Sequence, residues 1–471
     1  MSVHAKTFER RDPITGDVVT NAHAATVEEA IAIADRAAAA FPAWSAIGPS
    51  DRRAMLNKAA DILLSRADDF TELMMGETGA AAPWVHFNVK LAAGMLREAA
   101  AITTQIAGEV IPSDVPGCLS MAMRVPVGVV LGIAPWNAPI ILGVRAIALP
   151  LACGNTVVLK ASEISPGTQK LIGDVLTDAG LPEGVVNVVT NDPADNPAVV
   201  EALIAHPAVR RVNFTGSTRV GRIIGELAGR HLKPALLELG GKAPLVVLED
   251  ANIDEAVKAA AFGAFMHQGQ ICMSTERIVV DEKIADEFVA KLAAKARTLR
   301  TGNPRKEKGV VLGSLVDKKA AQRVQELIKD AIDKGAVLAA GGHVDGTIVN
   351  ATVLDKVTPD MKIYYEETFG PSVSVVRVRD TEEAIRVAND TEYGLAAAVF
   401  GSDISRALDV AKRLEAGSTH INGPTVQDEP QIPFGGMKAS GYGRFGGRAG
   451  IHEFTELRWI TIETKPHYYP F

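Results

Sequence analysis

The sequence contains few cysteines: Cys118, Cys153 and Cys272 are the three in 471 residues. No two of them form a C-x-x-C pair, so neither a disulfide framework nor a zinc site is indicated. The charged N-terminus also lacks the apolar run of a secretory signal. We therefore expect a cytoplasmic protein with free thiols and no bound metal.

An excess of positive charge is also missing. The formal net charge is −7, and no block of lysine or arginine occurs. Because such a chain has no basic surface to bind phosphates, we expect neither DNA nor RNA as a partner. The one long uncharged stretch, 126–144, contains three prolines. We predict a buried strand, a loop and a helix there, and no membrane partner.

What the chain does contain is an alternation of helical and β-rich segments. Its length and its 47% apolar composition predict two large domains. Helices are expected at 27–41 and 51–70. Short strands are expected further on, separated mostly by helical segments, at 127–133, 156–160, 185–189, 209–214 and 245–248. This alternation is typical of βαβ units in a doubly wound α/β sheet.

A second series of elements begins near Gly240 and predicts a second α/β domain. Its helices are expected at 254–265 and 286–299, and its strands at 373–378 and 396–400. Two further strands, 120–126 and 458–463, fall outside both domains. Strands in such positions suit an oligomerisation arm, with an ordinary hairpin as the alternative.

Two side chains are candidates for covalent chemistry. Cys272 lies in the small, polar segment HQGQICMSTER, where a loop thiol can reach a substrate. Lone intracellular cysteines are more often buried and inert, which is our interpretation of Cys118 and Cys153. Glu238 lies in the apolar run LLELGGKAP, where desolvation should raise its pKa toward that of a working base. The alternative for Glu238 is an ion pair with Lys242 or another cation.

Two segments are candidates for binding a nucleotide. In FTGSTRVG a strand leads through Gly216 into a helix whose N-terminus can bind phosphate. The spacing is neither G-x-G-x-x-G nor a P-loop, so an ordinary strand-to-helix turn is the alternative. In TVVLKASE a strand ends with Lys160 and Glu163 at its carboxyl edge. A carboxylate there can accept both ribose hydroxyls and would repel a 2′-phosphate.

Six short motifs together resemble the aldehyde dehydrogenase superfamily. In order they are PWN (135–137), KASE (160–163), FTGSTRVG (214–221), LELGGK (237–242), QGQIC (268–272) and EETFGP (366–371). The resemblance covers nearly the whole chain and implies the family fold. That fold has a Rossmann-like NAD-binding domain, a catalytic domain and a small β arm that forms a homodimer or homotetramer. The expected segments are 1–108 and 127–239 for the NAD-binding domain, 240–440 for the catalytic domain, and 109–126 and 456–471 for the arm.

The resemblance implies a role for each matching residue. Cys272 is the nucleophile that forms a thioester, and Glu238 activates the water that hydrolyses it. The side-chain amide of Asn137 and the backbone N–H of Cys272 stabilise the oxyanion. Glu238 also implies water, and not coenzyme A, as the acyl acceptor, while Glu163 favours NAD over NADP. The implied cofactor-binding residues are Ile133, Pro135, Trp136, Lys160, Ser162, Glu163, Gly216, Ser217, Val220, Gly221, Leu239, Glu367 and Phe369.

Further stretches, including APWVHFNV, VRAIALP and the terminal YPF, resemble family members that oxidise salicylaldehyde. This likeness implies a flat aromatic aldehyde as substrate, salicylaldehyde first. Benzaldehyde, vanillin and a broad specificity are the alternatives. The implied substrate residues are Trp84, Phe87, Phe434 and Arg145. Packing within the core or an interface is the alternative role for these four side chains.

The sequence departs from the family pattern at two places. The resemblance begins near the second strand of the family's N-terminal hairpin, so we expect that hairpin to be incomplete. Phe445 stands where many relatives carry an acidic residue, which places more of the base chemistry on Glu238.

Two functions of other classes remain as alternatives. A cysteine hydrolase without a redox cofactor could use the same thiol and carboxylate, but no motif places a histidine beside Cys272. A binding protein that has lost its activity is disfavoured because Cys272, Glu238 and Asn137 are all present.

Overall fold

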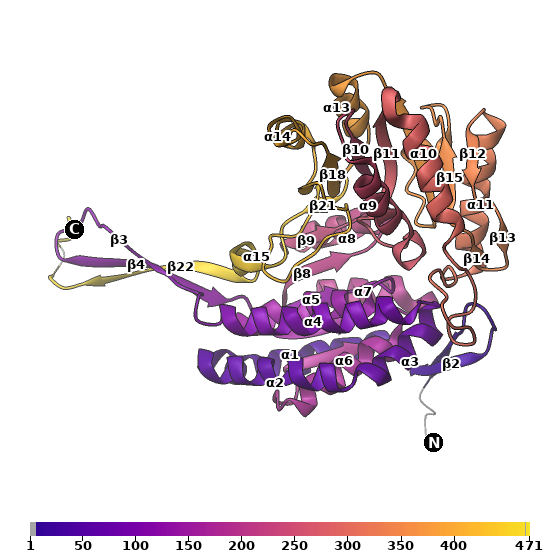
Figure 1. Ribbon diagram of the computed structural model, residues 1–471. Coiled ribbons are helices and arrows are strands. Elements are labelled where there is room, and N and C mark those ends of the chain that lie inside the picture. Colours follow the sequence, from indigo (N-terminus) through magenta and orange to yellow (C-terminus); the bar gives the residue numbers. More distant parts are fainter. Residues whose placement is uncertain (1–5, 467) are drawn as a thin grey trace.

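Two sheets organise the fold, and an arm of strands projects from it (Figure 1). The computed structural model describes residues 6–466 and 468–471. Residues 1–5, in the first predicted domain, and residue 467, in the predicted arm, lie outside the described residues. Within the described part, no helix has the length and apolarity that crossing a membrane requires.

The first sheet has the strand order β21-β9-β8-β5-β6-β7. All of its neighbours are parallel except β21, which pairs antiparallel with β9 at one edge. The central strands β5 and β6 are buried at every residue, as expected for a parallel sheet covered on both faces. The strands are β5 (Val129–Ile133), β6 (Thr156–Lys160), β7 (Val186–Val189), β8 (Val209–Thr215), β9 (Ala235–Glu238) and β21 (Gly441–Tyr442).

Helices pack on both faces of this sheet. On one face, α2, α4, α5 and α6 share an apolar core with β5 and β6. On the other face, α1, α7 and α8 pack against the same strands and β8. The helices are α1 (Val27–Ala46), α2 (Pro49–Ser65), α3 (Ala67–Thr78), α4 (Ala82–Ile102), α5 (Pro139–Ala152), α6 (Pro166–Asp178), η1 (Pro193–Asp195), α7 (Asn196–Ala205) and α8 (Thr218–Arg230).

Two local expectations are wrong. The N-terminal hairpin is present as two antiparallel strands, β1 (Thr7–Arg11) and β2 (Val18–His23), which pair from Thr7 with His23 to Arg11 with Val18. The segment 51–70 is not one helix, because the backbone of Arg66 leaves helical geometry between α2 and α3.

The second sheet has the order β12-β15-β16-β11-β10-β18-β19. Helices α9 and α10 cover one face, while α13 and α14 cover the other. The strands are β10 (Ala243–Val247), β11 (Thr275–Asp281), β12 (Val337–Ala340), β15 (Thr352–Asp355), β16 (Ser372–Val378), β18 (Ala396–Phe400) and β19 (Ser418–Ile421). The helices are α9 (Ile253–Phe265), η2 (Met266–Gly269), α10 (Glu282–Arg297), α11 (Lys318–Asp333), α12 (Lys362–Tyr365), α13 (Thr381–Asn389) and α14 (Ile404–Arg413). The last helix, α15 (Gly447–Glu453), contacts α4 and lies at the base of the arm.

The chain passes from the first sheet to the second between β9 and β10, and it returns to the first sheet at β21. The predicted α/β class with doubly wound parallel sheets is confirmed. Two-stranded pairs complete the body: β13 (Val344–Asp345) with β14 (Ile348–Val349), and β17 (Tyr393–Gly394) with β20 (Met437–Lys438).

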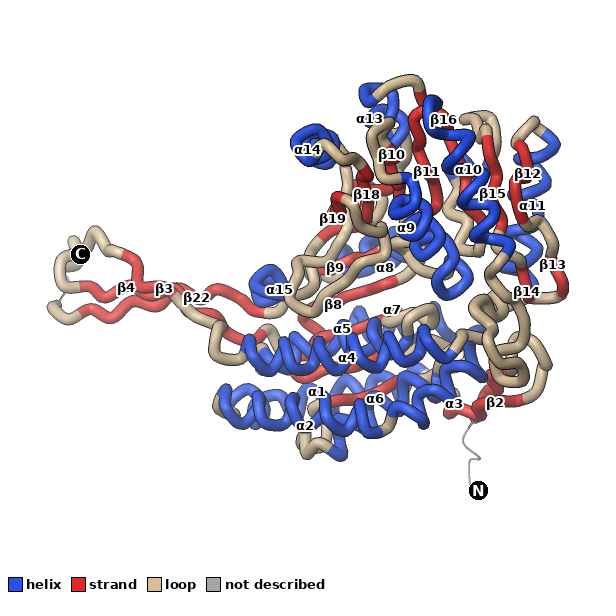
Figure 2. Tube along the Cα trace, in the orientation of Figure 1, coloured by secondary structure: helices blue, strands red, loops and turns tan. Residues whose placement is uncertain are grey.

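The arm is a three-stranded antiparallel sheet of β3 (Glu109–Ile111), β4 (Cys118–Pro126) and β22 (Thr455–Glu463). It extends away from both sheets, as Figures 1 and 2 show. The two strands expected outside the domains therefore pair with each other. Trp459, Val110 and Leu457 are exposed on it by 75%, 72% and 60%.

Candidate active site

Cys272 lies in a short loop between η2 and β11 that two glutamine side chains fasten in place. Gln268 donates to the carbonyl of Ser314 at 2.8 Å, and Gln270 accepts from the N–H of Val316 at 3.0 Å. A Cβ at Gly241 would lie 2.3 Å from the Cys272 carbonyl, so this close approach requires glycine. The QGQ and LGG motifs thus place the thiol from two sides.

The Cys272 thiol lies in an environment that disfavours its anion. Removal from water raises its pKa well above the usual value, and the charge of Glu238 raises it further. Arg145 acts in the opposite direction. The resting group is a thiol, and it needs a base before it can attack.

Glu238 is the last residue of β9 and is 1% exposed. Among the described residues, neither of its carboxylate oxygens has a hydrogen bond of normal geometry, although the Cys272 and Thr215 side chains lie close enough to lower its pKa. Burial raises its pKa to about 7, and Cys272 and Arg145 lower it only in part. A carboxylate with this pKa is half ionised near neutral pH, which suits a general base.

Asn137 follows β5 and is fixed by hydrogen bonds on both its side chain and its backbone. Its side-chain Nδ2 donates to the carbonyl of Gln270 at 2.9 Å, two residues before Cys272. Its own carbonyl accepts from the indole Nε1 of Trp84 at 3.0 Å. One hydrogen of the amide remains for a substrate oxygen, next to the loop that carries the thiol.

The structure therefore brings together a thiol, an unpartnered carboxylate and a fixed amide from three distant parts of the chain. The alternative that Glu238 forms an ion pair with Lys242 is wrong. Lys242 instead pairs with Glu276 at 2.8 Å.

The predicted nucleotide residues lie at the carboxyl edge of the first sheet. Lys160, the last residue of β6, lies 3.5 Å from the carboxylate of Glu163. Gln169 on α6 links this edge, because it accepts from the N–H of Ser162 at 2.6 Å and donates to the carbonyl of Pro135 at 3.0 Å. Ile133, at the end of β5, pairs in register with Lys160.

The strand-to-helix turn at α8 has the geometry expected of an anion site. Ser217 is the N-cap of α8, and its hydroxyl accepts from the N–H of Val220 at 3.4 Å. Gly221 lies against Leu239, and a Cβ there would come within 2.3 Å of the leucine side chain. Gly216 donates its N–H to the Glu238 carbonyl at 3.0 Å, which joins this turn to the candidate base.

Glu367 and Phe369 lie on a loop of the second sheet. The Glu367 carboxylate accepts from the N–H of Gly241 at 2.9 Å, and burial raises its pKa to about 7. The Phe369 ring meets the Trp136 ring edge to face, with centroids 5.8 Å apart. Lys160, Glu163, the N-terminus of α8 and this pair together fit a dinucleotide: they offer groups for ribose hydroxyls, for phosphates and for an aromatic ring.

The four predicted substrate residues form two separate groups. Trp84 and Phe87 stack on α4 with centroids 5.4 Å apart. Arg145 on α5 forms a buried ion pair with Asp428 and lies over the ring of Phe434, 4.3 Å from its centroid.

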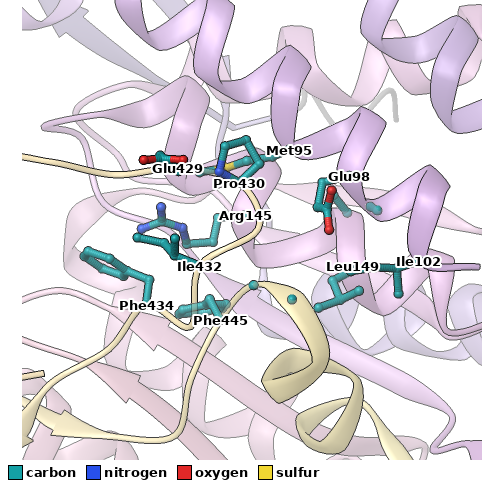
Figure 3. A pocket seen from close by; sticks show the side chains of 14 residues that line it. Met95, Glu98, Ile102, Arg145, Leu149, Glu429, Pro430, Ile432, Phe434 and Phe445 are labelled. Atoms are coloured by element: carbon teal, nitrogen blue, oxygen red, sulfur yellow. The ribbon is translucent and has the colours of Figure 1, made fainter. Parts of the chain in front are cut away.

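Arg145 and Phe434 line a small cavity of about 40 Å³ between α4, α5 and the 429–434 segment (Figure 3). Trp84, Phe87 and the three candidate catalytic residues are not among its lining residues. Phe445 forms part of its wall, so no carboxylate reaches Glu238 from that position. Cys153 is buried with a pKa of about 12, as expected of an inert thiol.

Three residues of the site were not predicted from the sequence. His267 stacks on Trp84 with centroids 5.1 Å apart and is 2% exposed, while Asp428 and Glu276 are the partners of Arg145 and Lys242. Glu276 offered one signal, a carboxylate opening an apolar strand. His267 and Asp428 lie in irregular segments whose letters predict no partner.

Comparison with known proteins agrees with this geometry. The model of the aldehyde dehydrogenase family matches residues 1–460. A vanillin dehydrogenase of Pseudomonas sp. is 62% identical over 99% of this chain and 96% of its own. The crystal structure of a salicylaldehyde dehydrogenase from Pseudomonas putida, complexed with salicylaldehyde, has a TM-score of 0.97 at 53% identity, covering 99% and 96% of the two chains. A structure of PnpE in complex with nicotinamide adenine dinucleotide has a TM-score of 0.94 at 36% identity, covering 99% and 96%. The chain belongs to the aldehyde dehydrogenase family.

Proposed function

We propose that this protein oxidises an aromatic aldehyde to its carboxylate with NAD, through a thioester on Cys272. The observation that supports it most is the unpartnered, buried carboxylate of Glu238, whose charge is felt by the Cys272 thiol. An ordinary buried glutamate is hydrogen-bonded or paired. A buried glutamate that lacks a partner and lies beside a thiol is suited to act as a general base.

The residues divide the reaction into two halves. Glu238 accepts the thiol proton and passes it on to solvent, which leaves its carboxylate ionised again. Cys272 Sγ bonds to the aldehyde carbon, while Asn137 Nδ2 and the Cys272 N–H stabilise the oxygen. Bound NAD supplies the acceptor for the hydride that leaves this carbon. Glu238 then takes a proton from the water that attacks the thioester, which releases the acid and the free thiol.

NAD is proposed over NADP because of Glu163. Its carboxylate lies beside Lys160 at the sheet edge, where it would accept ribose hydroxyls and repel a 2′-phosphate. The PnpE structure with bound NAD supports the same cofactor. Turnover with each cofactor at equal concentration tests the choice, and faster turnover with NADP would contradict it.

Two aromatic aldehydes are the leading substrates. The sequence favours salicylaldehyde, and the 53% identical structure with that ligand supports it. The 62% identical relative supports vanillin. Values of kcat/KM for salicylaldehyde, vanillin, benzaldehyde and a straight-chain aldehyde decide between them. Preference for the straight-chain aldehyde would contradict the aromatic class.

The thioester itself can be located. Glu238→Gln protein that is mixed with aldehyde and NAD should form the thioester slowly, because the thiol has lost its base, and should hydrolyse it more slowly still. The acyl group should therefore accumulate on Cys272, and peptide mass spectrometry identifies the modified side chain. An acyl group on another residue would contradict the proposed reaction, as would its absence after NADH has formed.

The arm is proposed to join copies of this chain into a homodimer or homotetramer. Trp459 and Leu457 are exposed on one face of the arm and Val110 on the other, so a monomer would leave apolar side chains of both faces in water. Light scattering of wild type and of Trp459→Glu tests this. A monomeric wild type would contradict it.

A further inference from the structure

The segment Glu366–Pro371 carries Glu367 and Phe369 next to the candidate active site, and its backbone includes an unfavourable conformation. Phe369 has φ of +49°, a left-handed conformation that is unfavourable for a non-glycine residue. Such a conformation persists only where the surroundings impose it.

Glu276 is the first group that imposes this conformation. It lies on β11 and is 3% exposed. Its Oε1 accepts from the N–H of Thr368 at 2.9 Å and from the N–H of Phe369 at 3.0 Å, and its Oε2 accepts from the N–H of Thr368 at 3.0 Å. A carboxylate that accepts two successive backbone N–H groups holds their peptide planes in one orientation.

Lys242 is the second group. It is the last residue of the LELGGK motif, directly before β10, and it contacts the same segment. Its Nζ donates to Glu276 Oε2 at 2.8 Å, to the carbonyl of Glu366 at 2.7 Å and to Thr368 Oγ1 at 3.4 Å. These three acceptors use all three protons of the ammonium group. The side chain is fully buried, so the pair receives no help from water.

The segment held by this pair reaches the other candidate site residues directly. Gly241, next to Lys242, donates to the Glu367 carboxylate at 2.9 Å. The Phe369 ring contacts Trp136, the residue before Asn137. A shift of the Thr368 backbone would therefore move both side chains that are proposed to face the nicotinamide half of the cofactor.

We infer that Lys242 and Glu276 are positioning residues, which hold Glu367 and Phe369 in the orientation that hydride transfer requires. The inference rests on the proposed role of those two residues. Neither Lys242 nor Glu276 is placed against substrate or the reacting atoms. The pair acts through the backbone of residues 366–369 and leaves the adenosine side, at Lys160 and Glu163, unaffected.

The test removes both charges together, because one partner alone would leave a buried unpaired ion. In Lys242→Met/Glu276→Gln we expect the single-turnover rate of NADH formation to fall about 10- to 100-fold through misplacement of the ring. The affinity for NAD should fall as well. The affinity for ADP-ribose, which lacks nicotinamide, should stay that of wild type, as measured by calorimetry.

Two further variants make the result decisive. Glu276→Asp keeps the charge, and so the fold, but draws the carboxylate back from the two N–H groups; it should show the same pattern at smaller size. Asp355→Asn breaks an ion pair with Arg377 elsewhere in the same sheet and should show no such pattern.

Wild-type NADH formation in both pair variants would overturn the inference, and so would an equal loss of NAD and ADP-ribose affinity. If the proposed function is wrong and the positioning role is right, the experiments give a different result. Wild-type protein that binds NAD but oxidises none of the aldehydes would contradict the proposed function alone, because the comparison of NAD with ADP-ribose needs no aldehyde.

Discussion

The regions around Glu238 and Glu276 contain two buried glutamates of the same protein with opposite surroundings. Glu238 has no hydrogen bond of normal geometry among the described residues, and its pKa is raised to about 7 by burial. Glu276 receives two backbone N–H groups and an ammonium. An acceptor that is already satisfied can hold a loop but not take a proton, whereas an unsatisfied one is costly to bury and ready to react.

The largest expected effect comes from removing the nucleophile of the region around Glu238. Cys272→Ala should abolish aldehyde oxidation, because no other thiol is presented to the aldehyde, while calorimetry should show unchanged NAD binding. Turnover near that of wild type would place the nucleophile elsewhere. Cys153→Ala is the matched control and should retain activity.

Removing only the carboxylate of Glu238 tests whether this residue is the base that activates the hydrolytic water. Glu238→Gln keeps the size of the side chain but cannot accept the proton from water, so steady turnover should fall about 10²- to 10⁴-fold. One burst of NADH per site should remain, but slower than in wild type, because the thiol must then lose its proton to solvent without Glu238. Rapid-mixing absorbance at 340 nm measures both phases. Unchanged steady turnover would remove Glu238 from thioester hydrolysis.

The same substitution should have opposite effects on stability in the two regions. Glu276→Gln leaves Lys242 buried without its countercharge and should lower the free energy of unfolding by about 3 kcal/mol. Glu238→Gln removes a carboxyl whose folded pKa lies above its unfolded one. The stabilisation from its protonated form is complete below about pH 4.5 and is lost as the pH rises through 7.

At pH 8.5 Glu238→Gln should therefore be more stable than wild type, by about 2–3 kcal/mol, and this advantage should shrink toward pH 5. Thermal unfolding of both variants at the two pH values checks the signs. A shift in the same direction for both would mean that the two carboxylates do not differ as described.

The smallest expected effect is on the pH profile of wild type. A base with a pKa of about 7 is mostly protonated at pH 6 and mostly ionised at pH 8, so kcat should rise about tenfold over that interval when hydrolysis limits the rate. Glu276→Asp should keep the same profile, because Glu276 moves no proton. A flat profile for wild type would contradict the raised pKa.

Much of the fold could be predicted from local pattern. The strand at 156–160 is observed as β6, and the start of α1 at Val27 follows its capping threonine, Thr26. Short elements were not predicted. Strand β21 has two residues, too few for any periodicity, and pairs with β9 because the chain returns there after the second sheet. The break between helices α2 and α3 at Arg66 could not be predicted, because no proline or glycine lies there.

The candidate site divides in the same way. Cys272 and Glu238 were predicted from the character of their local segments, and Asn137 was predicted from the resemblance of the PWN motif to the family. The partners of Trp84 and Arg145 could not be predicted, because His267 and Asp428 reach them only through the packing of distant segments. The expected incomplete hairpin rested on a resemblance at the start of the chain, and the pairing of β1 with β2 overturned it.

The sequence by itself determined the α/β class and which residues have the chemistry of a nucleophile, a base and an amide donor, because these properties belong to single residues and short segments. The tertiary structure alone decided which carboxylate is free and which is saturated. Lys242 meets Glu276 across 34 residues, and Glu276 meets Thr368 across 92. A buried charge takes whichever partner the fold brings within hydrogen-bond distance, and that choice determines whether it reacts or holds the structure.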